Sequence, residues 1–360
     1  MAVLTEKAKI NPDLKPDRLA VGLGGLASIL IIFVLGFLWL RDGQATQVVK
    51  AFVAIVWGVS GVAGLYFFAN MSAESLPERW MKRVQPFVFV GPAMALLGWY
   101  LAIPTLRTFF ASLYNQQGEF GLSNYVAVFT ERIMVEAWTN NILWMIVGTT
   151  LTVSLGLLIA ILADRSRFEN IAKSLIFMPM AISMVGAGVI WKFVYDRNPD
   201  IGLLNAVVQS AGGEPQAWLS LVQPWNNLFL IVVMVWLQTG YAMVLISAAI
   251  KGVPDDLLEA ARVDGATEVQ IFFRIIIPSI AGTLVTVITT VIIFTLKIFD
   301  VVMVMTGGQF GTEVIGVRFY REMFTSRNDG YASAIAIVLL LAVVPVMIYN
   351  LRQFSKRETF

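Results

Sequence analysis

Long uncharged stretches dominate the pattern of hydrophobic and polar positions along this 360-residue chain. A helix needs about 18 or more apolar residues to cross a bilayer, and eight stretches free of Asp, Glu, Lys and Arg reach that length. These stretches are residues 19–40, 51–73, 84–106, 137–163, 174–191, 215–250, 275–296 and 330–351. Since the sixth stretch is too long for one span, we expect its helix to start near Trp225. The pattern predicts an all-α polytopic membrane protein with eight transmembrane helices.

One polar segment, residues 251–278, separates the sixth and seventh stretches and reads KGVPDDLLEAARVDGATEVQIFFRIIIP. Pro254 suits the first position of a helix, and Asp255 and Asp256 then face the positive end of the helix dipole. We expect this helix to stop near Gly265, because glycine readily takes the backbone conformation that ends a helix.

A second short helix is predicted to follow directly. Thr267 and Gln270 have the spacing of a capping box, and we expect the helix to end at Pro278. Two short helices hinged at a glycine would suit docking to a partner protein. An amphipathic element lying on the lipid headgroups is the alternative.

Composition agrees with a membrane protein, since 58% of the residues are hydrophobic and 14% are charged. Sixteen of the 26 Lys and Arg residues fall on the side of the membrane that carries the amino terminus. Because basic residues favour the cytoplasmic side, we expect both termini and residues 251–278 to be cytoplasmic. This makes the chain a multi-pass protein of the plasma (inner) membrane, with its first apolar stretch kept as a span.

The absence of certain residues and motifs limits the chemistry. There is no His and no Cys, which excludes a thiol nucleophile, an imidazole base and a His or Cys metal site. There is also no GxxxxGK[ST] motif, so transport driven by ATP would need a separate ATPase chain. We expect no cofactor on this chain, with ATP and magnesium bound by that partner. The net charge of +2 does not indicate nucleic-acid binding.

Polar residues at the ends of two spans are candidates for a substrate path. Lys297 and Asp300 lie three residues apart, which places them on one helical face and permits a salt bridge between them. This pair could line the outer mouth of a path or simply anchor the helix end. Tyr195 and Asp196 lie at the end of the fifth span, where an aromatic ring suits either sugar stacking or an aromatic belt at the interface.

Two further candidates fall inside the sixth span. Gln238 and Tyr241 are polar, and polar side chains within a membrane need either a neighbouring helix or a wet cavity as partner. We include both residues in the predicted substrate path.

Six positions of the polar segment match a known signature. Glu259-Ala260-Ala261, Gly265, Ile275 and Pro278 resemble the signature loop of ABC importer permeases, which reads EAA, three residues, G, nine residues, I-x-L-P. Ile277 replaces the family's leucine. In that family the loop docks into a cleft of the cytoplasmic ATPase. The resemblance therefore assigns ATPase coupling to Glu259, Ala260, Ala261, Asp264 and Gly265.

Further matches resemble the maltose-type carbohydrate branch of this family. They are Pro254-Asp255-Asp256-Leu257, Asp264-Gly265-Ala266, and Phe299-Asp300 leading to Thr306-Gly307-Gly308. Gln309 and Phe310 depart from the family's glycine and proline there. The resemblance implies that Phe294 and Thr295 belong to the substrate path and that Thr306, Gly307 and Gly308 contact a binding protein.

The resemblance also implies a domain organisation and partners. Residues 84–352 would form the six-helix importer core with coupling loop 251–278, after an amino-terminal part (1–83) with two extra spans and before a tail (353–360). The extra spans are similar to the larger permease of maltose-type systems, which favours a heterodimer with a smaller permease, although a homodimer remains open. Two ATPase subunits, an extracytoplasmic sugar-binding protein and membrane lipid would be the other partners.

Two functions compete at this point. The first is the permease of a binding-protein-dependent ABC importer that moves a sugar, with an oligosaccharide or α-glucoside favoured, by alternating access. The alternative is an ion-coupled secondary transporter in which Lys297 and Asp300 relay the ion. No spaced set of catalytic residues indicates an enzyme.

Overall fold

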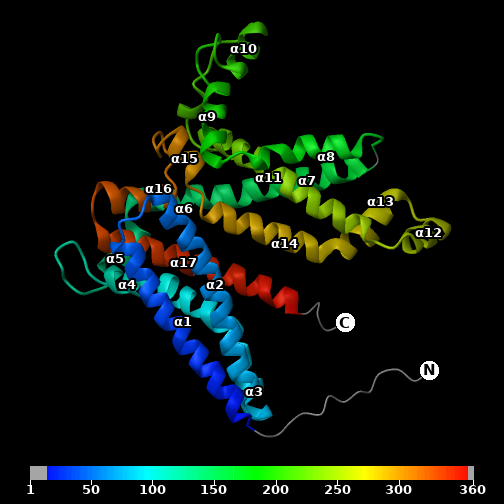
Figure 1. The fold of residues 1–360 in the computed structure, drawn as a ribbon. Helices are drawn as coiled ribbons and strands as arrows, with labels where there is room; N and C mark the ends of the chain where they lie inside the picture. Colours follow the sequence, from blue (N-terminus) through cyan, green and yellow to red (C-terminus); the bar gives the residue numbers. More distant parts are fainter. Residues whose placement is uncertain (1–13, 165, 356–360) are drawn as a thin grey trace. The chain divides into compact units, whose positions relative to one another are not determined.

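The structure is a computed structural model that describes residues 14–164 and 166–355. No β-strand occurs among these residues, and helices follow one another through nearly all of them (Figure 1). The chain forms two compact units, residues 1–106 and 107–360. The predicted all-α architecture is confirmed.

The first unit is built from three long helices. They are α1 (Pro16–Asp42), α2 (Gln47–Glu74) and α3 (Glu78–Leu97), and α3 continues through the π-helical turn η1 (Gly98–Ala102). α1 packs along α2, and α2 also contacts α3. The two expected extra spans are α1 and α2. The predicted start of the importer core at residue 84 stays a prediction. The first compact unit extends to residue 106 and therefore includes α3.

The second unit has a central layer of three helices. α7 (Thr149–Asp164), α11 (Trp225–Lys251) and α14 (Ile277–Leu296) contact one another, and α17 (Asp329–Ser355) packs against α14 (Figure 1). α11 begins at Trp225, as predicted.

The shorter elements of this unit cap and connect those helices. They are α4 (Ile103–Ser112), which begins before the unit boundary, α5 (Ser123–Thr130), α6 (Arg132–Leu143), η2 (Trp144–Gly148), α8 (Glu169–Phe177), η3 (Met178–Ala181), α9 (Met184–Val194), α10 (Leu203–Ser210), η4 (Trp218–Ser220), α12 (Asp255–Val263), α13 (Glu268–Ile271), η5 (Phe272–Ile276), α15 (Asp300–Met305), α16 (Ile315–Tyr320) and η6 (Arg321–Thr325).

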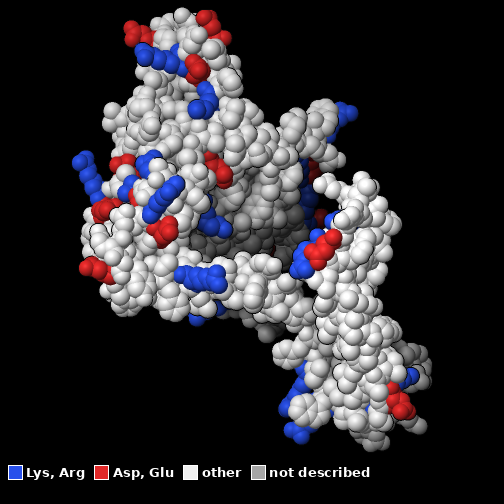
Figure 2. Space-filling model, turned by 60° about the vertical axis from the view of Figure 1, so that its left-hand side comes forward, with Lys and Arg blue, Asp and Glu red and all other residues white. Residues whose placement is uncertain are grey.

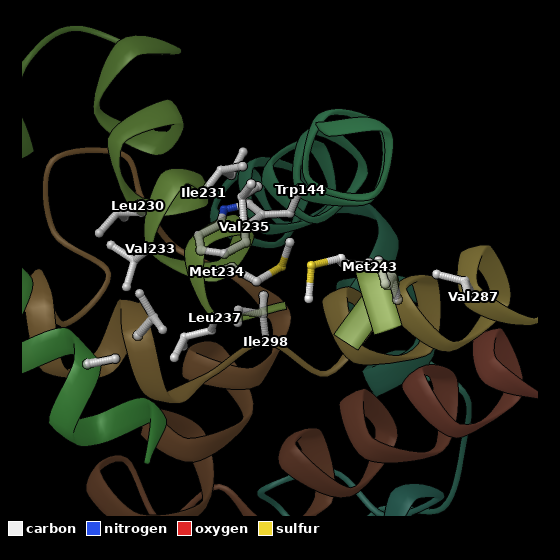
Figure 3. Close-up of a cluster of buried hydrophobic side chains, with 14 of the residues drawn as sticks. Trp144, Leu230, Ile231, Val233, Met234, Val235, Leu237, Met243, Val287 and Ile298 are labelled. Carbon is white, nitrogen blue, oxygen red and sulfur yellow. The ribbon is translucent and has the colours of Figure 1, made fainter. Parts of the chain in front are cut away.

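The core of the second unit lies where α11 crosses its neighbours. Trp144, Met234, Met243 and Val287 are each fully buried and come from three different helical segments (Figure 3). Trp144 also donates a hydrogen bond from Nε1 to the side-chain oxygen of Asn227, at 3.3 Å. The outer faces of the helices carry exposed large hydrophobic residues, and charged residues stand in groups separated by uncharged surface (Figure 2). Such a surface suits lipid contact.

Seven helices of the described chain are long and apolar enough to cross a membrane, and a bent pair makes the eighth candidate. Counted with the bent pair, the candidate spans number eight, as predicted, but the fifth is not one straight helix. Its two halves, Glu169–Ala181 and Met184–Val194, meet at an angle of 103°. Ile182 is extended, and Ser183 starts the second half by accepting a hydrogen bond from the Gly186 amide at 3.0 Å.

Candidate coupling and translocation sites

Residues 251–278 form the two short helices expected from the sequence. α12 ends at Val263, Gly265 follows with a φ of +78°, and α13 starts after Thr267. The predicted capping box is present, because Thr267 Oγ1 accepts from the Gln270 amide while Gln270 Oε1 accepts from the Thr267 amide. Pro254 occupies the cap position instead of the first helical position.

The second helix does not end at Pro278. η5 widens the helix just before it, with the Ile277 amide bonded to the carbonyl of Phe272, and α14 then continues through Pro278 to Leu296. A wider π turn accommodates a proline because it relieves the contact between the ring and the preceding carbonyl group. The Ser279 hydroxyl donates a hydrogen bond to the Ile275 carbonyl at 2.7 Å. α13, η5 and α14 therefore form one continuous path from the polar segment into the seventh span.

The outer surface of the helix pair exposes apolar as well as charged groups. Leu257, Val263 and Val269 are 51%, 87% and 66% exposed, and Glu259 and Ala260 are exposed between them. No residue of α12 is buried. An exposed apolar patch on a charged helix is typical of a surface that another protein covers.

Of the predicted path residues, Lys297 and Asp300 do not form the expected pair. α14 ends at Leu296 and α15 starts at Asp300, so the two residues lie in separate elements and share no helical face. No salt bridge joins these two residues in the structure. The prediction of one helix through both residues is wrong, because Lys297 leaves the helical backbone with φ −98° and ψ 16°. Lys297 itself is exposed.

Three other predicted path residues serve the local structure. Tyr195 is 5% exposed, and its hydroxyl donates to the Phe229 carbonyl at 3.0 Å. Thr295 is fully buried and donates to the Ile292 carbonyl at 2.9 Å. Asp196 accepts the Asn198 amide at 2.8 Å in the loop after α9.

The remaining predicted path residues are partly exposed. Gln238 and Tyr241 lie three residues apart on α11, so they share one face of that helix, and neither side chain has a hydrogen bond within the described chain. Phe294 is also partly exposed and lies in the last turn of α14. These three residues and Lys297 are therefore the predicted path residues whose side chains stay accessible, and their role in a substrate path stays a prediction.

A stripe of hydroxyl groups runs along α14, and the sequence analysis did not predict it. Ser279, Thr283, Thr286 and Thr290 recur at intervals of three and four residues, which places them on one face of the helix, and each is at least partly exposed. Ser279, Thr286 and Thr290 each donate their hydroxyl proton to a carbonyl one turn back, leaving the oxygen lone pairs free to accept. The helical spacing of the hydroxyls was the available signal.

The segment predicted to contact a binding protein is a tight loop with an unusual backbone. Gly307, Gly308 and Gly311 have φ values of +63°, +79° and +76°, and Phe310 has +60° despite its side chain. Thr306 supports the turn through a 2.6 Å contact between its hydroxyl and that of Thr312. Glycine is favoured at positions 307 and 308 because of these backbone conformations, and contact of this loop with a binding protein stays a prediction.

Buried asparagines hold this loop, which the sequence did not reveal. Asn140 donates from Nδ2 to the carbonyls of Gly311 and Glu313 at 2.9 and 2.7 Å. Asn226 donates to the Phe310 carbonyl at 2.5 Å. The loop is therefore hydrogen-bonded both to α6, through Asn140, and to α11, through Asn226. Asn141 accepts the Ile315 amide at 2.9 Å. Runs of asparagine at the ends of apolar stretches were the only signal in the sequence.

The structure and its sites define a class: a polytopic helical membrane protein with an exposed helix pair connected directly to a spanning helix. Comparison with known proteins identifies the family. Residues 152–357 match the family described as "Binding-protein-dependent transport system inner membrane component", and the chain belongs to this family.

Two relatives are similar over most of this chain. The "Osmoprotective compounds uptake permease protein GgtC" of Synechocystis sp. is 52% identical over 277 residues, covering 75% of this chain and 99% of the relative. The "Alpha-glucoside transport system permease protein AglF" of Rhizobium meliloti is 42% identical over 332 residues, covering 87% of this chain and 98% of the relative.

A solved structure supports the fold. A bacterial ABC transporter involved in alginate import contains a chain with a TM-score of 0.67 and 20% identity, covering 79% of this chain and all of that chain. The chain is therefore an ABC importer permease, and ATP hydrolysis belongs to a separate subunit. The ion-coupled alternative is not supported, because the family uses ATP-driven partners and the proposed relay pair is not formed.

Proposed function

We propose that this chain is the larger permease subunit of an importer for a sugar, with residues 251–278 as the loop that couples it to the ATPase. The observation that carries the coupling role is the exposed helix pair α12 and α13, which presents apolar side chains and continues through η5 into α14. ATPase closure would move this pair, and the movement would switch the path between inward and outward access. Glu259, Ala260, Ala261, Asp264 and Gly265 are the proposed coupling residues.

A saccharide is the substrate class that we favour, in particular an oligosaccharide or α-glucoside. The relative AglF is an α-glucoside permease by name and resembles most of this chain. The hydroxyl stripe of α14 supports the proposal, because free lone pairs at intervals along a helix can accept hydrogen bonds from the hydroxyls of a passing sugar. Gln238, Tyr241, Phe294 and Lys297 would complete the path with amide, phenol, aromatic and ammonium groups.

Osmoprotective compounds are a second candidate substrate class. The relative GgtC, which is 52% identical, takes up such compounds by name. Uptake assays with maltose, trehalose and glycine betaine as probes would separate the two candidates.

The assembly that we propose is a heterodimer of this chain with a smaller permease, two ATPase subunits that bind ATP and magnesium, and an extracytoplasmic binding protein. Residues 84–352 would form the importer core. Thr306, Gly307 and Gly308 would contact the binding protein, with the loop held in one conformation by Asn140 and Asn226. The loop and residues 251–278 would then face opposite sides of the membrane, with the termini cytoplasmic; residues 1–13 and 356–360 of those termini lie outside the described residues.

The coupling role is tested at Gly265. Gly265→Val should disturb the turn between α12 and α13, because a β-branched residue at φ +78° is strained by about 1–2 kcal/mol. We expect loss of substrate-stimulated ATPase activity and of ATP-dependent sugar uptake in vesicles that contain the assembled transporter. No atom lies within 4 Å of the position that a Cβ would take at Gly265, so the effect would come from the backbone.

Gly265→Asn is the matched control, because asparagine adopts this conformation more readily than other residues. It should keep most of the activity. Equal activity of the valine and asparagine variants, both at wild-type level, would show that the conformation of this turn is not needed for coupling. Sugar uptake by the wild-type transporter without ATP would contradict the proposed function itself.

A further inference from the structure

A cluster of charged groups joins the ends of three helices beside the coupling loop. Lys173, in the first turns of α8, forms an ion pair with Asp164, the last residue of α7, and another with Glu169 at 2.6 Å. Its ammonium group also donates to the hydroxyl of Ser247 on α11. The ammonium has three donors, and they reach acceptors on α7, α8 and α11.

This cluster is largely shielded from solvent. The side chains of Lys173 and Asp164 are 18% and 13% exposed, and Ser247 is 3% exposed. Ser247 in turn donates to Asp164 at 2.7 Å, which closes a ring of contacts. Ion pairs that are shielded in this way are weakened less by salt than exposed ones, so they can hold helix ends together.

The cluster reaches the root of the coupling loop through Lys251. Lys251 is the last residue of α11, and its ammonium pairs with Glu169, which also pairs with Lys173. Val253, two residues further on, is buried, and α12 starts at Asp255. The start of α8 is therefore connected by ion pairs to the residues from which the coupling helix extends.

A cavity of about 650 Å³ lies between the coupling helices and this cluster. Its lining includes Asp164 together with Leu258 of α12 and Phe272 of η5. One carboxylate oxygen of Asp164 is buried and accepts no hydrogen bond within the described chain. The cavity leaves space between α12, η5 and the end of α7, and Asp164, the charged residue that α7 contributes to its lining, is part of the cluster.

From these contacts we propose that Lys173 is a positioning residue for coupling. It holds the ends of α7, α8 and α11 together, so that a displacement of α12 and α13 is passed to α8 and to the bend before α9. The bend of 103° between the two halves of the fifth span is the place where such a displacement would change the path. This inference rests on the proposed function and adds a residue outside the coupling loop to it.

The test measures sugar molecules taken up per ATP hydrolysed, in vesicles that contain the assembled transporter and its binding protein. Lys173→Met keeps the length of the side chain and removes its charge. We expect ATP hydrolysis to continue within about twofold while uptake per ATP falls about tenfold, the range of energetic coupling between sites. Lys173→Arg should restore most of the ratio, and Ser247→Ala should lower it by a smaller factor.

Lys82→Met is the matched control, because it removes an i,i+4 ion pair with Glu78 that belongs to α3 in the first unit and includes no residue of the cluster. It should leave the ratio unchanged. An unchanged ratio in Lys173→Met, or a parallel fall of ATPase activity and uptake together, would overturn the inference. If Lys173→Met fails to assemble, the ratio of uptake to ATP hydrolysis in Ser247→Ala decides instead, and an unchanged ratio there would overturn the inference. Failure of the wild-type transporter to take up any of the probe sugars would instead contradict the proposed function.

Discussion

At the residue scale, Glu313 in the loop after α15 shows how one carboxylate depends on its surroundings. Glu313 is 1% exposed, and its nearest charged partner is Arg321 at 3.4 Å. A Cβ at Gly308 would lie 2.1 Å from Glu313 Oε2, and the φ of +79° at this position also favours glycine. Burial raises the pKa of Glu313 above its ordinary value, although Arg321 and Arg318 lower it.

The raised pKa of Glu313 predicts a pH dependence of stability. Between the ordinary and the raised pKa the folded protein binds more protons than the unfolded chain, so the free energy of unfolding falls as pH rises through this window. Each unit of difference is worth about 1.4 kcal/mol. Thermal unfolding in detergent from pH 4.5 upward should show this slope in the wild type and a smaller slope in Glu313→Gln.

Glu214→Gln changes a carboxyl group on an exposed loop and is the matched control for this measurement. Its slope should equal that of the wild type. If Glu313→Gln also has the wild-type slope, Glu313 does not contribute to the pH dependence.

At the scale of elements, a glycine on α11 allows the first half of the broken fifth span to pack closely against that helix. Gly240 on α11 faces the end of α8, where an added Cβ would be 2.6 Å from the Ile176 carbonyl oxygen and 2.8 Å from Phe177 Cα. Gly156 on α7 similarly lets Ala242 of α11 approach closely. Small residues at helix crossings allow this approach in membrane proteins, where packing between helices replaces the hydrophobic driving force.

Gly240→Ala should therefore destabilise the protein. The clashing atoms belong to the backbone and cannot rotate away, so we expect a loss of about 1–3 kcal/mol, measured as a lower unfolding temperature in detergent. Gly58→Ala on α2 is the matched control, since no atom lies within 4 Å of the position of its added Cβ. Equal effects of the two substitutions would exclude close packing as the cause.

At the scale of the whole molecule, the two units suggest which part carries transport. The family match lies entirely within residues 152–357, in the second unit. α1 and α2 contain apolar faces and a polar contact from Trp57 Nε1 to the Ile32 carbonyl, but none of the proposed coupling or path residues.

Removal of residues 1–76 should leave a working permease. Two spans are lost, so the remaining helices keep their orientation, and we expect ATPase co-purification and substrate-stimulated activity within about twofold of the wild type. Removal of residues 1–44 is the control, because it deletes α1 alone and would place every later segment on the wrong side. Activity in the variant that lacks residues 1–44, or no activity in the variant that lacks residues 1–76, would contradict the assignment of transport to the later part of the chain.

The sequence by itself determined the local features. The uncharged stretches predicted the membrane helices, and the start of α11 at Trp225, the Thr267 capping box and the turn at Gly265 followed from the chemistry of a few neighbouring residues. These features depend on hydrophobic length, capping and backbone freedom, which act over one or two helical turns.

Only the tertiary structure decided which groups meet across the chain. The sequence could not show that Lys297 leaves the helix, that Tyr195 is buried, or that Lys173 joins three helix ends. Nor could it show that Asn140 and Asn226 hold one loop from two helices. Each of these facts depends on side chains far apart in the chain, whose partners are chosen by packing and by the need of buried polar groups for hydrogen bonds.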